Sequence, residues 1–247
     1  MAYRSTNPFS NTVEQTFEEL SDEQLQAKLQ AAQSCFEDTW RDQSFAQRKT
    51  VLKKAAALMR ERQHELAALA TREMGKLISQ STGEVALSAA ILDYYADHAE
   101  AFLAPEPLKT EKGQAVVESS PVGVLFGVEP WNYPYYQIAR FAAPNLMAGN
   151  VVMVKHASNV PQCALAFEQL MHDAGLPVGG YTNLFVSKDQ VGALIDDKRV
   201  RGVALTGSED AGAVVATRAG KNLKKSTMEL GGSDAFIVLE DADMARA

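Results

Sequence analysis

Apolar runs rich in β-branched residues alternate with amphipathic stretches from Val122 onward, and this alternation limits the folds open to the chain. The run Val151-Val152-Met153-Val154 is apolar throughout, as expected for a strand buried on both faces. The pattern predicts an α/β fold, a Rossmann-like and mainly parallel sheet with helices on both faces. Strands are expected near residues 122–128, 151–156, 181–186, 200–206, 223–229 and 235–239, and helices near 134–148, 160–174, 188–197 and 208–219.

The first 104 residues predict a helical segment that precedes the sheet. Residues 1–20 are expected to form a polar arm. Capping-box patterns at Ser21 and Ser44 predict helices that run to about Trp40 and to Gly75, and a third helix is expected over 83–103. The charged residues of these helices are expected on solvated faces.

Charge and composition exclude several classes of partner. A net charge of −7 argues against nucleic acids and anionic membranes, which select basic surfaces. No leader-like or membrane-length apolar run is present, so a cytoplasmic protein is expected. The two cysteines, Cys35 and Cys163, form no CxxC pattern, and the four histidines show no ligand spacing. Neither a disulfide framework nor a metal site is indicated.

Polar residues with chemical potential follow several of the expected strands. Asn132 stands in a turn fixed by two prolines, where its amide could donate to an oxyanion. Lys155 follows the apolar strand at 151–154, and Gly207-Ser208 opens a helix whose free N–H groups suit a phosphate. Each has a simpler alternative: Asn132 as a turn former, Lys155 as a surface residue and Ser208 as an N-cap.

A lone carboxylate, Glu229, precedes the glycine pair Gly231-Gly232 and an apolar run. Two glycines permit positive φ angles and close approach of a flat ligand. The alternative is a tight turn whose carboxylate is only solvated.

Four motifs, taken in order, resemble those of the NAD(P)-dependent aldehyde dehydrogenases. They are Pro130-Trp131-Asn132-Tyr133-Pro134, Val154-Lys155-His156-Ala157-Ser158, Leu205-Thr206-Gly207-Ser208 with Gly212, and Met228-Glu229-Leu230-Gly231-Gly232. The resemblance covers nearly the whole chain, and Asn7-Pro8-Phe9 also fits the opening of the family.

The resemblance implies a role for each matching residue. Glu229 would be the general base that hydrolyses a Cys thioester, and Asn132 would donate to the oxyanion. The cofactor, NAD or NADP, would be bound by Trp131, Lys155, Ser158, Gly207, Ser208 and Leu230. Ser158 stands where NAD-preferring members often carry Glu, so it leaves NADP open without selecting it.

The resemblance also implies a division of the chain. Residues 1–247 would form the cofactor-binding half of a larger enzyme, with a helical segment over 1–104, a β-hairpin that serves as an oligomerisation arm over about 105–121, and the Rossmann-like part over about 122–247. The nucleophilic Cys of the family lies beyond the Glu-Leu-Gly-Gly motif, so the catalytic domain would be absent and this chain alone inactive. Cys35 and Cys163 are expected to be packing residues.

Arg140 gives the hint to the substrate. It lies two helical turns beyond Asn132, where succinate-semialdehyde dehydrogenases also carry Arg, and a guanidinium suits the far carboxylate of such a substrate. The alternative is an Arg paired with a nearby acid. Phe141, where the family commonly has Lys, receives no functional interpretation.

Two functions remain open from the sequence. The first is NAD(P)-dependent oxidation of an aldehyde, with succinate semialdehyde as the expected substrate, by a homodimer or homotetramer. The second is a nucleotide-binding module without catalysis.

Overall fold

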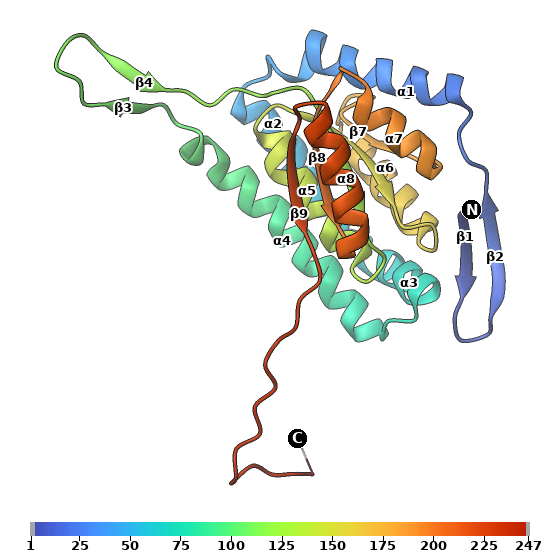
Figure 1. The fold of residues 1–247 in the computed structure, drawn as a ribbon. Coiled ribbons are helices and arrows are strands. Elements are labelled where there is room, and N and C mark those ends of the chain that lie inside the picture. The colour runs from blue at the N-terminus through green and yellow to red at the C-terminus, as the bar shows by residue number, and fades with distance from the viewer. Residues whose placement is uncertain (1–2, 246–247) are drawn as a thin grey trace.

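A computed structural model describes residues 3–245 and has a five-stranded parallel sheet at its centre (Figure 1). The strand order is β7-β6-β5-β8-β9. The strands are β5 (Val124–Glu129), β6 (Val151–His156), β7 (Tyr181–Asn183), β8 (Val200–Thr206) and β9 (Lys225–Glu229). The predicted α/β class is therefore confirmed.

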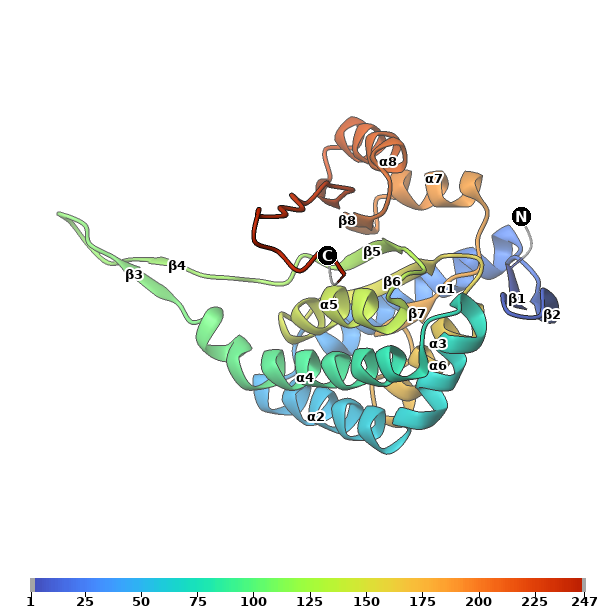
Figure 2. The same cartoon turned by 90° about the horizontal axis from the view of Figure 1, so that it is seen from below.

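Helices cover both faces of this sheet, as predicted. They are α5 (Pro134–Met147), α6 (Pro161–Asp173), α7 (Lys188–Asp196) and α8 (Glu209–Lys221). Figure 2 shows α7 and α8 on one side of the strands and α5 and α6 on the other. Helix α5 packs on β5 and β6, whereas α7 and α8 pack on β8.

Two strand predictions need correction. The strand expected at 181–186 ends at Asn183, and none forms at 235–239. In that second stretch Phe236 is 79% exposed and Ile237 77%. A strand needs a hydrogen-bonding neighbour, and no described strand of residues 3–245 lies beside this run, so its apolar composition alone does not order it.

The N-terminal residues form a hairpin rather than a free polar arm. Strand β1 (Tyr3–Asn7) pairs antiparallel with β2 (Thr12–Phe17). Tyr3 is buried, and its hydroxyl donates to the carbonyl of Val186 at 2.9 Å. The Arg4 N–H donates to the carbonyl of Ser158 at 3.0 Å, so the hairpin is tied to the loop that follows β6.

The helical layer contains one more helix than predicted. Its elements are α1 (Asp22–Cys35), a π-helical turn η1 (Phe36–Trp40), α2 (Phe45–Glu61), α3 (Gln63–Met74) and α4 (Ile78–Phe102). Both predicted capping boxes are present, and Gly75 ends α3 with a φ of 76°. The expected second helix is interrupted at Arg62, where no Gly or Pro marks the break.

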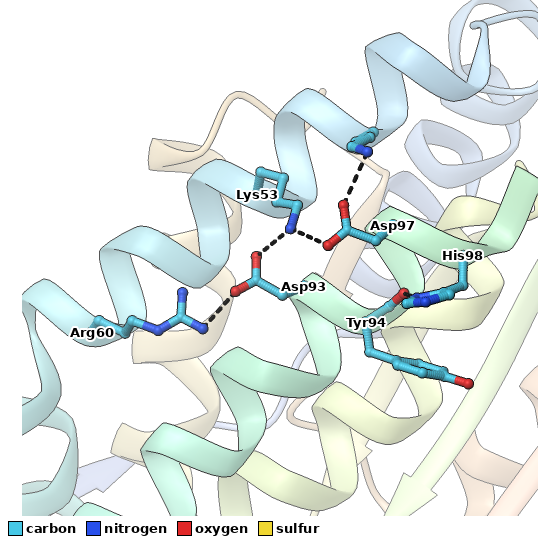
Figure 3. Close-up of polar contacts among 7 residues, drawn as sticks. Lys53, Arg60, Asp93, Tyr94, Asp97 and His98 are labelled. Carbon is cyan, nitrogen blue, oxygen red and sulfur yellow. Dashed lines mark hydrogen bonds and ion pairs between the residues drawn. The ribbon is translucent and has the colours of Figure 1, made fainter.

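Charged side chains join α2 to α4 on the outer surface of the layer (Figure 3). Lys53 Nζ lies 3.2 Å from Asp93 and 2.5 Å from Asp97, and Arg60 Nη2 lies 2.5 Å from Asp93. Beside them, His98 Nδ1 donates to the carbonyl of Tyr94 at 2.8 Å. Exposed ion pairs add little stability, about 0.2–1 kcal/mol each. The packing of the buried face of α4 therefore contributes more to its attachment than these ion pairs do.

A narrow hairpin projects from the body between α4 and β5 (Figure 1). Its strands, β3 (Glu106–Leu108) and β4 (Ala115–Val117), are antiparallel. Leu108, Val116 and Val117 are about half exposed, at 48%, 51% and 49%. Leu108 and Val117 share one face of this ribbon and Val116 lies on the other, so both faces expose apolar side chains without a described partner in residues 3–245. A two-stranded ribbon is only marginally stable by itself.

Candidate active site

The residues singled out after the strands lie at one edge of the sheet. The register pairs Glu129, the last residue of β5, with His156 of β6, and it pairs Thr206 of β8 with Glu229 of β9. All four are at the carboxyl ends of parallel strands, which is where ligands bind in open α/β sheets.

Asn132 lies in the turn between β5 and α5, at the middle of this edge. Trp131, Asn132 and Tyr133 are exposed, whereas Pro134 and Tyr135 at the start of α5 are buried. The turn thus exposes the Asn132 amide to solvent, while the start of the helix that follows it is buried. Its turn-forming role is observed, and a role toward an oxyanion remains a proposal.

Lys155 and Ser158 lie at the end of β6, close to the N-terminal hairpin. Lys155 Nζ donates to the carbonyl of His156 at 3.1 Å and lies 5.5 Å from the ring centroid of Tyr3. Burial lowers the pKa of Lys155 from its ordinary value. Lys155 is therefore half-buried, and its ammonium has partners within the fold.

Ser208 is the N-cap of α8. Its hydroxyl accepts from the N–H of Ala211 at 3.3 Å, so the simpler interpretation of this residue is correct for the local structure. Gly212 in the next turn allows Leu230 to pack onto the helix, because a Cβ there would lie 2.5 Å from Leu230 Cδ2. The Gly207 N–H donates to the carbonyl of Glu229 at 3.0 Å. These contacts bring the third and fourth motifs together.

Arg140 and Glu229 form an ion pair across the edge. Arg140 Nη1 lies 3.5 Å from Glu229 Oε2, and Arg140 Nη2 donates to Gln137 Oε1 at 3.1 Å and to Thr206 Oγ1 at 3.2 Å. The side chain of Glu229 is 56% exposed. The predicted alternative of an Arg paired with an acid is thus observed, and its partner is the candidate general base.

Gly231 and Gly232 follow β9 in an exposed segment. Neither has a positive φ angle, and a Cβ on either would meet nothing within 4 Å. Strand β9 ends at Glu229, and the chain continues without a described partner strand. The conformational freedom of the two glycines is therefore not used in this structure.

A pocket of about 470 Å³ opens beside Arg140, between α5 and strands β5, β8 and β9. The buried carboxyl of Glu129 lines it, and its Oε2 has no hydrogen-bond partner among residues 3–245. Burial raises the pKa of Glu129 to about 8, so this carboxyl is mostly protonated at neutral pH. Phe141 also lines the pocket and packs on Gly127, where a Cβ would lie 2.7 Å from its ring.

Buried carboxylates of the helical layer were missed by the sequence analysis, which placed such charges on solvated faces. Glu84 accepts from the N–H groups of Tyr135 and Tyr136 at the start of α5, at 2.8 and 3.2 Å. Glu73 accepts from Gln162 and Cys163 at the start of α6, both at 2.9 Å. Both helices begin with Pro and lack a side-chain cap of their own. The absence of an N-cap residue at these two helix starts was the sequence signal that another side chain must cap them.

The two cysteines are packing residues, as predicted. Both are buried, and burial raises the pKa of the Cys35 thiol to about 11 and that of Cys163 well above its ordinary value.

Residues 3–245 contain no cluster of three or more potential metal ligands. None of the helices described is both long and apolar enough to cross a bilayer.

The sheet order, the covering helices and the polar carboxyl edge define a nucleotide-binding fold of the Rossmann-like class. The sequence model of the aldehyde dehydrogenase family matches residues 1–247, and the chain belongs to this family.

Several known proteins are similar to this chain in sequence and in structure. The chain is 48% identical over 242 residues to a succinate-semialdehyde dehydrogenase [NADP(+)] of Deinococcus radiodurans, covering 98% of this chain and 50% of the relative. A probable enzyme of the same name in Synechocystis is 47% identical, with 100% and 54% covered. The crystal structure of succinic semialdehyde dehydrogenase from Streptococcus pyogenes with NADP+ superposes with a TM-score of 0.95 at 48% identity, covering 99% of this chain and 54% of that one. The chain thus spans about half the length of these relatives.

Proposed function

We propose that the whole protein oxidises succinate semialdehyde to succinate through a Cys thioester, with NADP or NAD as hydride acceptor. The observation that supports this best is Arg140 beside Glu229 at the carboxyl edge, in a chain similar to succinate-semialdehyde dehydrogenases. A fixed cation next to a half-exposed carboxylate suits a substrate that carries a carboxylate at one end and reacts at the other.

Each residue has one task in this proposal. Arg140 binds the far carboxylate of the substrate, and the Asn132 amide donates to the oxyanion that forms on the aldehyde oxygen. Glu229 takes a proton from the water that hydrolyses the thioester. Because Cys35 and Cys163 are buried with raised pKa values, neither is proposed as the nucleophile.

The donor set at the edge fits a dinucleotide. Lys155 and Ser158 would bind the adenosine ribose, Gly207 and Ser208 the pyrophosphate, and Trp131 and Leu230 would line the groove. When bound, the nicotinamide accepts the hydride. The missing Cβ at Gly207 leaves room for a phosphate at the start of α8, where the positive end of the helix dipole favours an anion.

The test of this function is a rate comparison on the whole protein with NADP. We expect reduced cofactor, followed by its absorbance, to form with a kcat/KM at least about tenfold higher for succinate semialdehyde than for butanal, since one charged contact is worth about 1.5–3 kcal/mol. Cofactor binding without reduction of cofactor by either aldehyde would instead indicate a nucleotide-binding module.

Lys155→Ala is expected to weaken NADP binding to the whole protein by about 1–3 kcal/mol, through loss of a charged hydrogen bond. Since burial lowers the pKa of Lys155, its charge, and the affinity that depends on it, should be lost at a less alkaline pH than for an ordinary lysine. Calorimetry measures both. The exposed neighbour Lys188 is the control, and equal losses in Lys188→Ala and Lys155→Ala would remove Lys155 from the site.

We also propose that the β3–β4 hairpin is an oligomerisation arm in a homodimer or homotetramer. The exposed side chains of Leu108 and Val117 on one face and Val116 on the other support this, because an isolated ribbon gains stability when a second chain covers it.

A further inference from the structure

Buried side chains from three other parts of the chain contact the turn that carries Asn132 and the start of α5. The four residues after Asn132 each have such a contact. The Tyr133 ring lies on Lys76, the Pro134 carbonyl meets His156, and the N–H groups of Tyr135 and Tyr136 meet Glu84.

Glu84, from α4, replaces the missing N-cap of α5. The side chain of Glu84 is completely buried. Its Oε1 accepts from the N–H groups of the second and third residues of α5, Tyr135 and Tyr136, and its Oε2 lies 2.5 Å from Lys76 Nζ. A carboxylate here satisfies two helix donors and complements the positive end of the helix dipole.

Lys76 links this cap to the turn itself. It follows Gly75 in the connection from α3 to α4, and its side chain is only 6% exposed. Its ammonium lies 3.5 Å from the centroid of the Tyr133 ring, the residue adjacent to Asn132. The charge therefore serves two partners at once, the Glu84 carboxylate and an aromatic face.

His156 holds the same turn from β6. The ring is fully buried, and burial lowers its pKa to about 4, so it is neutral at neutral pH. Nε2 lies 2.8 Å from the Pro134 carbonyl oxygen, whereas Nδ1 lies 3.1 Å from the Glu129 carbonyl oxygen and 3.0 Å from the N–H of Ala157. The shorter contact at Nε2 and the N–H that faces Nδ1 favour the proton on Nε2. Nε2–H thus donates to the first residue of α5.

We propose that Lys76, Glu84 and His156 are positioning residues that fix the Asn132 amide for the oxyanion. The inference rests on the function proposed above for Asn132. An exposed amide gains its catalytic value from being preorganised, and a displacement of about 1 Å can cost up to 100-fold in rate. These three residues touch neither substrate nor cofactor in this account. They act only through the turn.

The test removes the cap without leaving a buried charge unpaired. In the whole protein, Lys76→Met with Glu84→Leu deletes both charges and the cap, whereas Lys76→Met with Glu84→Gln deletes the charges but keeps an amide oxygen for the two N–H groups. We expect kcat with saturating succinate semialdehyde to fall about 10–100-fold in the first pair and to recover most of that loss in the second. KM should change by less than about threefold in both.

Glu73→Leu is the matched control for stability. It removes an equivalent buried cap from α6, a different helix from the one that follows Asn132. We expect it to lower the melting temperature by an amount comparable to the Leu-containing pair while kcat stays within about twofold of the wild type.

A double-mutant cycle with Asn132→Ala separates positioning from a general structural role. If Glu84 acts through Asn132, the loss in the Leu-containing pair should vanish once Asn132 is Ala. An equal loss in both backgrounds, or no loss in the wild-type background, overturns the proposal. Should that pair not fold, His156→Leu is put through the same cycle, with an expected loss of about 3–10-fold that must also vanish.

The same data distinguish this inference from the function on which it rests. A wild-type protein that oxidises no aldehyde, or an Asn132→Ala variant with full kcat, contradicts the proposed function. Normal activity with a sensitive Asn132 and an insensitive cap contradicts only the positioning role.

Discussion

A Glu229→Gln variant of the whole protein is expected to release a first burst of about one reduced cofactor per site and then to turn over about 10²–10⁴-fold more slowly than the wild type. Thiolate attack and hydride transfer do not need this base, whereas hydrolysis of the thioester does. Stopped-flow absorbance of the reduced cofactor separates the two phases.

Glu129→Gln is the matched control for this experiment. Glu129 lines the same pocket, and its raised pKa of about 8 makes it mostly neutral at neutral pH, so an uncharged amide resembles its normal state. We expect its steady-state rate to stay within a fewfold of the wild type. A Glu229→Gln variant that loses the burst together with the turnover would contradict the assignment of Glu229 to hydrolysis alone.

Arg140→Leu is expected to lower kcat/KM for succinate semialdehyde by about 2–4 kcal/mol, mainly through KM, and to leave butanal nearly unaffected. The substrate carboxylate loses a bidentate, charge-assisted partner, and a neutral aldehyde has no such contact to lose. Arg140→Lys should recover only part of the effect, because an ammonium keeps the charge but not the planar fork. Initial rates with the two aldehydes measure both variants.

Arg201→Leu provides a control with the same change in charge. Arg201 also lines the pocket, but it packs near Gly123 at the opposite ends of the strands, away from Glu229. We expect little change for either aldehyde. If Arg140→Leu lowers the rates of charged and neutral aldehydes by similar factors, Arg140 is a structural partner of Glu229 and not a substrate contact.

The strands and helices of the sheet could be predicted because their signals are local. The apolar run at 151–154 and the alternation that follows need no knowledge of partners. The run at 235–239 is also apolar throughout, but no described strand of residues 3–245 lies beside it, so the same signal gave a wrong strand. Similarly, nothing local marks the interruption between α2 and α3 at Arg62.

The motifs allowed the residues of the candidate site to be proposed one by one. The buried contacts that support these residues could not be predicted from the sequence. Glu84 and Tyr135 are 51 positions apart, and Arg140 and Thr206 are 66 apart, so only the fold reveals these contacts. A glutamate in an amphipathic helix normally faces solvent. Its burial becomes predictable only when the helix that it caps is known to have no capping side chain of its own.

A crystal structure of the whole protein with succinate semialdehyde tests the central claim most directly. The quantity to measure is the distance between the substrate carboxylate oxygens and the Arg140 guanidinium nitrogens. We predict two contacts of about 2.7–2.9 Å, with Glu229 drawn away from its present position 3.5 Å from Arg140. A substrate carboxylate bound elsewhere, with the Arg140–Glu229 pair intact, would contradict the account.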